Sequence, residues 1–118
     1  MPQFDVYRNQ NPGSSEQFPF LVDVQADLLE ELGTRVVVPL ARSAELTGFP
    51  AQYLMPIIAF LGHSYSLLTP QLAGVLRGEL GEQAGSLAHE ERLISMALGF
   101  LLTGFDGAYA RSSRFSGS

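Results

Sequence analysis

The residue types that most often carry catalysis are few in this sequence and poorly placed for it. The chain has two histidines, His63 and His89, and no cysteine. His63 falls at a turn between two expected strands and His89 opens an expected helix, so we interpret both as solvated or capping residues rather than catalysts or metal ligands. No glycine-rich phosphate loop and no hydrolase or metalloprotease signature occurs. The sequence therefore predicts a protein without catalytic residues, cofactor or metal, and not an enzyme.

Carboxylates offer the alternative acid–base chemistry. The adjacent pair Glu30 and Glu31 does not converge on one substrate and is interpreted as a loop edge. Asp23 and Asp27 lie in and beside an expected strand, where two carboxylates could act as acid and base. We expect neither a histidine nor an arginine beside them, so acid–base catalysis is not the function we favour.

The elements that position these residues are mostly strands. Alternating apolar and polar residues predict strands at 4–7 and 20–25, and a β-branched run predicts a buried strand at 35–40. Further strands are expected at 53–61 and 64–68, with a weaker one near 75–80. The first two are expected to form a hairpin across the turn-rich loop 9–15. Pro39 indicates an edge strand or a bulge, and Gly62-His63 is the expected turn after 53–61. Residues 28–32 stay ambiguous, 41–52 read as a connecting arm, and 69–73 as a short helical turn.

One strong helix is expected from His89 to Leu102. Its apolar residues recur at helical spacing on more than one face, which predicts burial nearly all round. Gly99 in its interior indicates close packing, and Gly104 stands where a left-handed helix cap is expected. Strands followed by one C-terminal helix predict a mainly β, β-rich α+β domain.

Composition limits the partners. The 118 residues are 46% hydrophobic and 16% charged, and all seven cations are arginines in a chain of net charge −5. Scattered arginines on an acidic chain argue against direct nucleic-acid binding. The longest apolar run, 54–61, is too short to span a membrane. The N-terminus lacks a secretory pattern and the chain lacks cysteine, so we expect a cytoplasmic protein. The excess of apolar residues suggests that a partner covers part of the surface.

Several segments resemble the CcdB family of plasmid and chromosomal toxins. The most specific is Phe20–Leu29 with the sequence FLVDVQADLL, and Gln3–Tyr7, Val38–Ala41 and Leu87–Glu91 resemble the family at matching distances. The resemblance implies an SH3-like barrel, with an antiparallel sheet of about five strands, an additional small sheet and one long C-terminal helix. We expect a CcdB-like toxin domain over residues 1–105 and a flexible tail over 106–118.

The resemblance also implies a function. Toxins of this family serve plasmid maintenance in type II toxin–antitoxin systems: they bind the DNA gyrase A subunit and trap the cleaved gyrase–DNA complex. They assemble as homodimers, and a cognate CcdA-like antitoxin wraps and neutralises them. Toxin and antitoxin together repress their operon, with the antitoxin contacting the DNA. The chain is thus expected to meet DNA only through the antitoxin.

Gyrase contact in the family falls at the end of the last helix and at two apolar residues after V-D-V-Q. By position the implied gyrase-binding residues are Leu28, Leu29, Gly99, Leu102, Thr103, Gly104 and Phe105. The family's helix ends in Trp-Gly-Ile, whereas Thr103 stands in place of the tryptophan, and the chain contains no tryptophan at all. Because a buried aromatic anchor contributes about 2 kcal/mol or more, weakened or altered gyrase poisoning is expected.

Two other functions remain open at this point. A non-toxic family member would keep only dimerisation and antitoxin binding, and would act in operon regulation. An RNA-cleaving enzyme would resemble the MazF/Kid toxins, which share the fold. The scattered arginines and the lack of an evident group of arginine, acid and base disfavour the second alternative.

Overall fold

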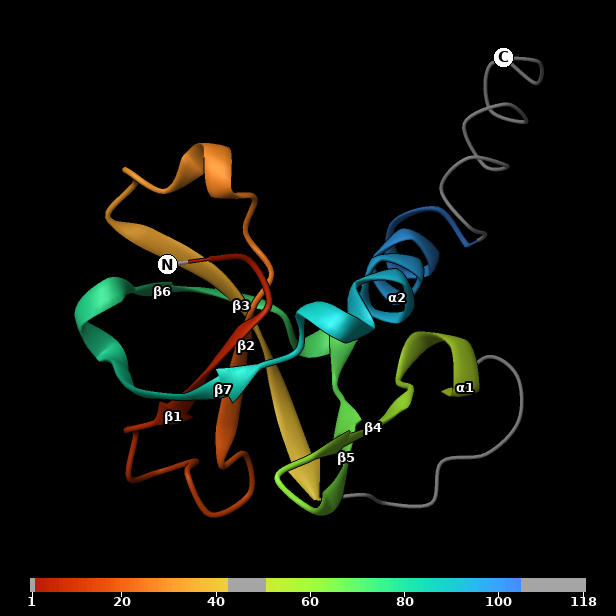
Figure 1. Cartoon of the computed structure of the whole chain (residues 1–118), viewed down its shortest axis with the longest axis horizontal. Coiled ribbons are helices and arrows are strands. Elements are labelled where there is room, and N and C mark those ends of the chain that lie inside the picture. The colour runs from red at the N-terminus through yellow and green to blue at the C-terminus, as the bar shows by residue number, and fades with distance from the viewer. Residues whose placement is uncertain (1, 43–50, 105–118) are drawn as a thin grey trace.

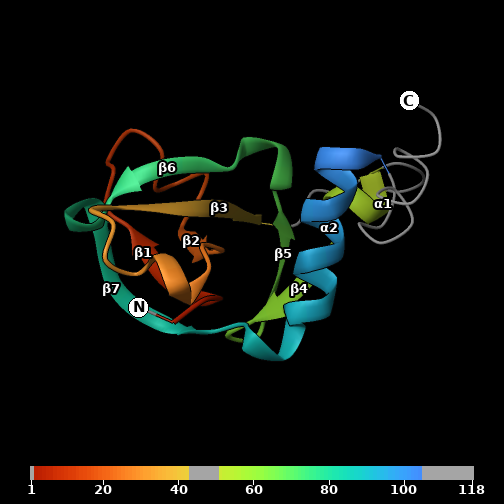
Figure 2. The same cartoon turned by 90° about the horizontal axis from the view of Figure 1, so that it is seen from above.

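The computed structural model describes residues 2–42 and 51–104. Seven strands of this part form one antiparallel sheet in the order β4-β5-β3-β2-β1-β7, with β6 pairing with a further stretch of β3. The sheet curls into a half-open barrel whose open side is covered by the C-terminal helix α2 (Figures 1 and 2). The strands are β1 (Asp5–Asn9), β2 (Phe20–Asp23), β3 (Thr34–Arg42), β4 (Ile57–Phe60), β5 (His63–Leu67), β6 (Ala73–Leu76) and β7 (Leu80–Ser86), and the helices are α1 (Ala51–Leu54) and α2 (Glu91–Thr103).

The mainly β fold with one long C-terminal helix is confirmed, and so is the hairpin of β1 and β2. Its register places Val6 opposite Val22, and Val22 lies opposite Val38 on the next strand. All three valines are fully buried, so one row of β-branched side chains crosses three strands. The small additional sheet expected beside the main one is continuous with it, because β5 pairs with the end of β3.

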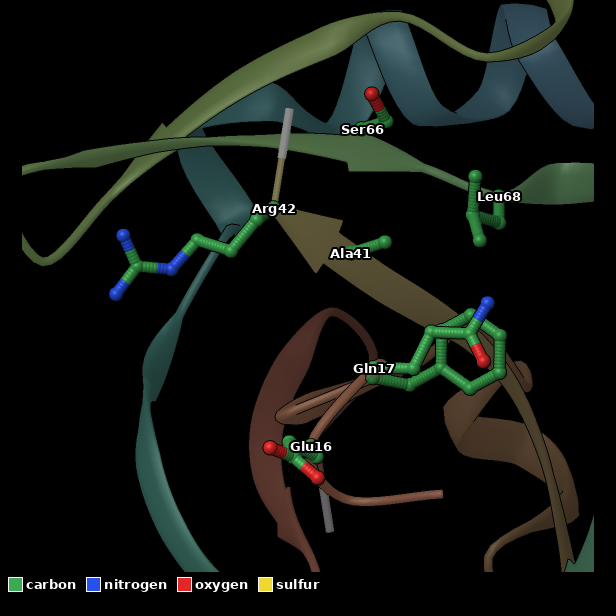
Figure 3. A pocket seen from close by; sticks show the side chains of 7 residues that line it. Glu16, Gln17, Ala41, Arg42, Ser66 and Leu68 are labelled. Carbon is green, nitrogen blue, oxygen red and sulfur yellow. The ribbon is translucent and has the colours of Figure 1, made fainter. Parts of the chain in front are cut away.

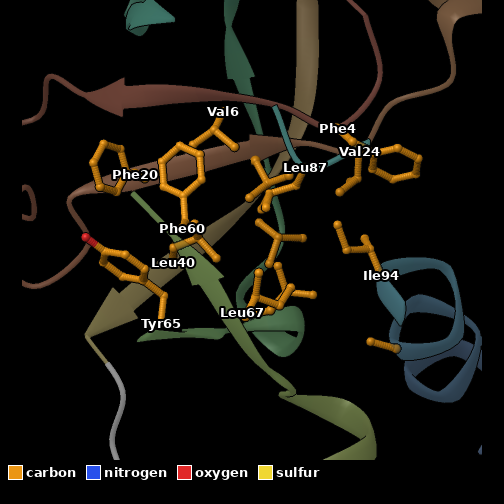
Figure 4. Close-up of a cluster of buried hydrophobic side chains, with 14 residues drawn as sticks. Phe4, Val6, Phe20, Val24, Leu40, Phe60, Tyr65, Leu67, Leu87 and Ile94 are labelled. Carbon is orange, nitrogen blue, oxygen red and sulfur yellow. The ribbon is translucent and has the colours of Figure 1, made fainter. Parts of the chain in front are cut away.

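The main core fills the inside of the curled sheet. Phe20, Phe60 and Tyr65 pack edge to face, with centroid distances of 5.2 Å for Phe20–Phe60 and 5.6 Å for Phe20–Tyr65. At the other end of the core, Ile94 of α2 joins the same cluster, which also contains Leu87 (Figure 4). Helix α2 therefore closes the barrel through one stripe of side chains.

The expectation that the C-terminal helix is buried nearly all round is wrong for this chain. Its fully buried residues are Ile94 and Ala97, whereas Met96 and Leu102 are exposed. The helix rests on the sheet along one side, where Leu93 and Leu98 are partly buried against the core, whereas Met96 and Leu102 face outward. It begins at Glu91 after a 3₁₀ turn, Ala88–Glu90, that contains the expected start at His89. The left-handed cap is confirmed, since Gly104 has φ +81° and its N–H donates to the Phe100 carbonyl.

The expected strand 53–61 is too long. Tyr53 belongs to α1, and β4 begins only at Ile57. Pro56 just before it has no N–H to donate, although its carbonyl still accepts the Leu67 N–H at 3.0 Å. The turn after β4 is Leu61-Gly62 rather than Gly62-His63. Both residues have positive φ, 49° and 80°, as a two-residue type I′ hairpin requires.

Pro39 lies neither at an edge nor at a bulge but inside the central strand β3. On one side this strand pairs with β6 through residues 34–37 and with β5 through residues 40–42. Pro39 sits where the pairing passes from β6 to β5, and its carbonyl accepts a bond from the Leu68 N–H on that side. The missing proline N–H therefore faces the gap between two strands, where it is not needed.

The weak strand expected near 75–80 is two strands separated by a 3₁₀ turn at Arg77–Glu79. Strand β7, which pairs with β1, was not expected, because its sequence LGEQAGS shows little alternation of apolar residues. Among the described residues, no helix is long and apolar enough to cross a membrane.

Candidate partner-binding site

The loop between β2 and β3, residues 24–33, presents leucines to solvent, and we call it the leucine loop. It contains a 3₁₀ turn, Asp27–Leu29, which settles the ambiguous segment 28–32. Leu28 is 93% exposed and Leu29 is 46% exposed, and Leu32 beyond them is also exposed. Two of the residues assigned to partner binding from the sequence are thus large apolar side chains that this chain leaves uncovered.

The end of α2 carries the remaining candidates. Leu102 is 74% exposed, Gly99 and Thr103 are half-buried, and Gly104 is exposed. The Thr103 hydroxyl donates to the Gly99 carbonyl over 2.7 Å, so it is used within the helix. Phe105, the last expected contact, lies outside the described residues.

The structure does not bring these two groups together within one chain. The turn at Asp27–Leu29 and the C-terminal end of α2 lie on different parts of the surface in both views of the cartoon (Figures 1 and 2). Each group is separately accessible, so a partner that contacts both must reach across the molecule or across two copies of it.

A buried ion pair lies at the base of the leucine loop. The Asp23 Oδ2 atom is 2.6 Å from Arg35 Nη2 and 2.9 Å from Arg35 Nε, and neither side chain is exposed. Burial raises the pKa of Asp23 above its usual value, against the bonds from Arg35 and from the Gln25 N–H, which lower it. The expectation that no arginine lies beside Asp23 is wrong.

Asp23 and Asp27 are not an acid–base pair. Asp23 is bound to Arg35, whereas the Asp27 carboxylate accepts the Gln3 N–H over 2.6 Å at the surface. The sequence contains a signal for the buried pair: an acid and a base interrupt the apolar residues of two neighbouring strands. Sequence reasoning missed Arg35 because it treated the arginines as scattered surface charges.

The histidines do not form a metal site. His63 is the exposed first residue of β5, with Nδ1 3.4 Å from Arg42 Nη1, and His89 is exposed in the turn before α2. Within residues 2–42 and 51–104, no cluster of three or more histidines and carboxylates is placed to hold a metal ion.

An open pocket of about 390 Å³ lies beside the end of β3. In Figure 3 its polar groups are dispersed around the rim rather than converging on one point. It therefore lacks the arrangement expected of a catalytic site. Its lining residues are Glu16, Gln17, Phe18, Ala41, Arg42, Ser66 and Leu68.

Fold and surface together define a small curled-sheet protein with one covering helix and exposed leucines suited to protein binding. The family model described as CcdB protein matches residues 3–104. The chain therefore belongs to the CcdB family, a family of toxins of toxin–antitoxin systems. The family resemblance of the sequence is confirmed.

A solved structure shares the fold. It is described as an endoribonuclease in complex with its cognate antitoxin from Mycobacterial species, and it superposes with a TM-score of 0.68. The two chains are 14% identical, and the match covers 86% of this chain and 94% of the other. At 14% identity this likeness shows a shared fold only, whereas the match to the family model shows the family to which the chain belongs.

Proposed function

We propose that this toxin-family chain binds the DNA gyrase A subunit and traps the gyrase–DNA cleavage complex. One observation carries the proposal: Leu28, Leu29 and Leu102, at positions assigned by the resemblance, are large apolar side chains left exposed. Covering a leucine contributes about 1.5–3 kcal/mol, so these three side chains suit an interface that buries them. Adjacent exposed apolar side chains such as Leu28 and Leu29 are typical of a protein–protein contact surface.

The proposed activity is weakened or altered by Thr103. The threonine hydroxyl already bonds to the Gly99 carbonyl, and the side chain offers no aromatic face to a partner. An indole over a cation contributes about 0.5–2 kcal/mol that threonine does not supply. We infer that any gyrase complex relies more heavily on the leucines than it does in relatives with tryptophan.

The same proposal includes the assembly and the place of action. We propose a cytoplasmic homodimer that a CcdA-like antitoxin neutralises and that meets DNA only through that antitoxin. The protein acts by binding and not by catalysis, without a cofactor. Purified protein incubated with RNA is expected to leave the RNA intact, and metal-independent cleavage would remove this part of the proposal.

The experiment is binding of the purified chain to the gyrase breakage–reunion domain. Four variants are compared with wild type: Leu28→Ala, Leu102→Ala, Thr103→Trp, and Leu61→Ala as the control. Leu61 is an exposed leucine in the turn between β4 and β5, outside the proposed site. We expect weaker binding for the first two, tighter binding for Thr103→Trp and no change for Leu61→Ala. Absence of micromolar binding by both wild type and Thr103→Trp would contradict gyrase as the partner.

A second candidate function has one observation in its favour. Thr103 lacks the anchor on which gyrase contact depends in the family, and its hydroxyl is turned inward. A non-toxic member would dimerise and bind antitoxin in operon regulation. Binding of the antitoxin encoded beside the gene, together with gyrase binding only by Thr103→Trp, would favour this function.

A further inference from the structure

The leucine loop combines exposed side chains with a firmly held backbone. The Leu29 carbonyl accepts the Gln25 Nε2 amide at 2.9 Å. The Glu30 carbonyl accepts Arg77 Nη1 at 3.2 Å, and the Gly33 carbonyl accepts the Arg77 N–H at 3.1 Å. Three hydrogen bonds from outside the turn thus hold the backbone of this loop in place.

Gln25 occupies the central place in this arrangement. Its side chain is buried, and both ends of its amide are used: Nε2 donates to Leu29 O, and Oε1 accepts the Val36 N–H at 3.0 Å. The Gln25 side chain therefore links the leucine loop to strand β3. A buried amide that loses such partners destabilises its surroundings, so the two bonds favour a single loop conformation.

The buried ion pair of Asp23 and Arg35 in turn holds the backbone of Gln25. The Gln25 N–H donates to Asp23 Oδ1 at 3.0 Å, while the other carboxylate oxygen is held by Arg35. A chain of contacts thus runs from the fully buried Arg35 through Asp23 and Gln25 to the backbone of Leu29. The rigid sheet determines where the exposed leucines stand.

We propose that Gln25 is a positioning residue for partner binding, presenting Leu28 and Leu29 in their bound conformation through its bonds to Leu29 and Val36. The inference rests on the proposed function only in taking these leucines as the contact. A loop already ordered before association does not lose conformational freedom when the complex forms. Gln25 itself is buried and need not touch the partner.

The first test needs no partner: amide hydrogen exchange compares wild type, Gln25→Met and Gln83→Met. Gln83 on β7 is the matched control, because its side-chain amide also makes a long-range bond, to Asp5 at 2.9 Å. In Gln25→Met we expect the Leu29, Glu30 and Leu32 amides to exchange roughly three- to tenfold faster. These amides should be unchanged in Gln83→Met. Equal loop exchange in wild type and Gln25→Met would overturn the proposal.

A second variant guards against global unfolding. Gln25→Glu keeps an acceptor for the Val36 N–H and removes the donor to Leu29 O. We expect it to loosen the loop amides while the Val36 amide and the amides of β1 stay protected. Loosening confined to β3, with the loop unchanged, would contradict a role in positioning the leucines.

The third test couples Gln25 to the leucines in a double-mutant cycle of binding to the gyrase breakage–reunion domain. If Gln25 acts through the loop, Gln25→Met made in the wild-type background weakens gyrase binding severalfold. The same substitution made in a chain with Leu28→Ala and Leu29→Ala has little further effect. A loss of equal size in both backgrounds would show that Gln25 does not act through these leucines. If wild type fails to bind gyrase, the proposed function falls, and the exchange measurement still decides whether Gln25 orders the loop.

Discussion

Arg35 and Asp23 form a salt bridge in which both side chains are fully buried, with Arg35 Nη2 2.6 Å from Asp23 Oδ2. The two residues stand on neighbouring strands, β3 and β2, directly below the loop that presents Leu28 and Leu29. Asp23 also accepts the Gln25 N–H, so the pair belongs to the support of that loop as well as to the core. Its energetics therefore bear on both stability and binding.

Removal of the Arg35 charge is expected to destabilise the protein strongly. Arg35→Met leaves the Asp23 carboxylate buried without its cation, which costs about 3–5 kcal/mol. The double variant Asp23→Leu/Arg35→Met removes both charges and is expected to recover most of that loss. Urea unfolding followed by circular dichroism measures both. If the double variant were as unstable as the single one, packing rather than charge would account for the effect.

The surface pair of Arg8 and Glu82 provides the control. Arg8 Nε is 3.5 Å from Glu82 Oε1, and both side chains are largely exposed. Because exposed pairs contribute about 0–1 kcal/mol, Glu82→Gln should leave the unfolding midpoint nearly unchanged. A large loss there would show that burial does not distinguish the two pairs.

The buried pair shows what the sequence could and could not predict. Alternation located β1 and β2, and a run of β-branched residues located β3. The same alternation placed Asp23 within a strand but did not say that Arg35 lies beside it. Partners in a sheet depend on register, and register is set by the fold as a whole.

Because of Asp5, the stability of the protein is expected to fall as the pH rises from the ordinary pKa of an aspartate through the higher pKa that Asp5 has in the folded state. Burial raises the pKa of Asp5, so the folded state holds a proton that the unfolded chain has already released. This contribution is complete below the unfolded pKa and is lost as the pH rises through the folded one. Asp5→Asn should flatten that part of the curve in urea unfolding at a series of pH values. An Asp5→Asn curve parallel to that of wild type would contradict the prediction.

The one-sided burial of α2 predicts unequal effects of alanine substitution along the helix. Ile94 is fully buried against the core, so Ile94→Ala is expected to cost about 2–5 kcal/mol. Leu101 is half-buried, and Leu101→Ala should cost less than Ile94→Ala. Met96 is 46% exposed and lies outside the core, so Met96→Ala should stay within about 0.5 kcal/mol of wild type. Equal losses at Ile94 and Met96 in thermal unfolding would show that both helix faces are covered in solution.

The candidate site was predictable only in part. The positions of Leu28, Leu29 and Leu102 followed from the family resemblance, and their exposure agrees with a role in binding. The hydrogen bonds of Gln25 that hold the leucine loop could not be predicted in this way, because the sequence pattern makes Gln25 only a polar residue of an alternating strand. Its two bonds join residues 4 and 11 positions away, and this pairing exists only after β2 and β3 have come together.

Strand β7 was not predicted because its sequence LGEQAGS shows little alternation of apolar residues. Its glycines allow a last prediction. A Cβ atom on Gly81 would lie 2.7 Å from the Arg8 carbonyl oxygen, which is backbone and cannot rotate away. Gly81→Ala should therefore force β7 away from β1 and cost about 1–3 kcal/mol.

Gly74 in β6 is the matched control for Gly81→Ala. It is also a strand glycine, but a Cβ atom added there meets nothing within 4 Å. Gly74→Ala should thus be neutral or slightly stabilising, because alanine restricts the unfolded chain more than glycine does. Thermal unfolding of the two variants beside wild type separates the cases. If both alanines were tolerated equally, the close approach of β7 to β1 would not be what selects glycine at position 81.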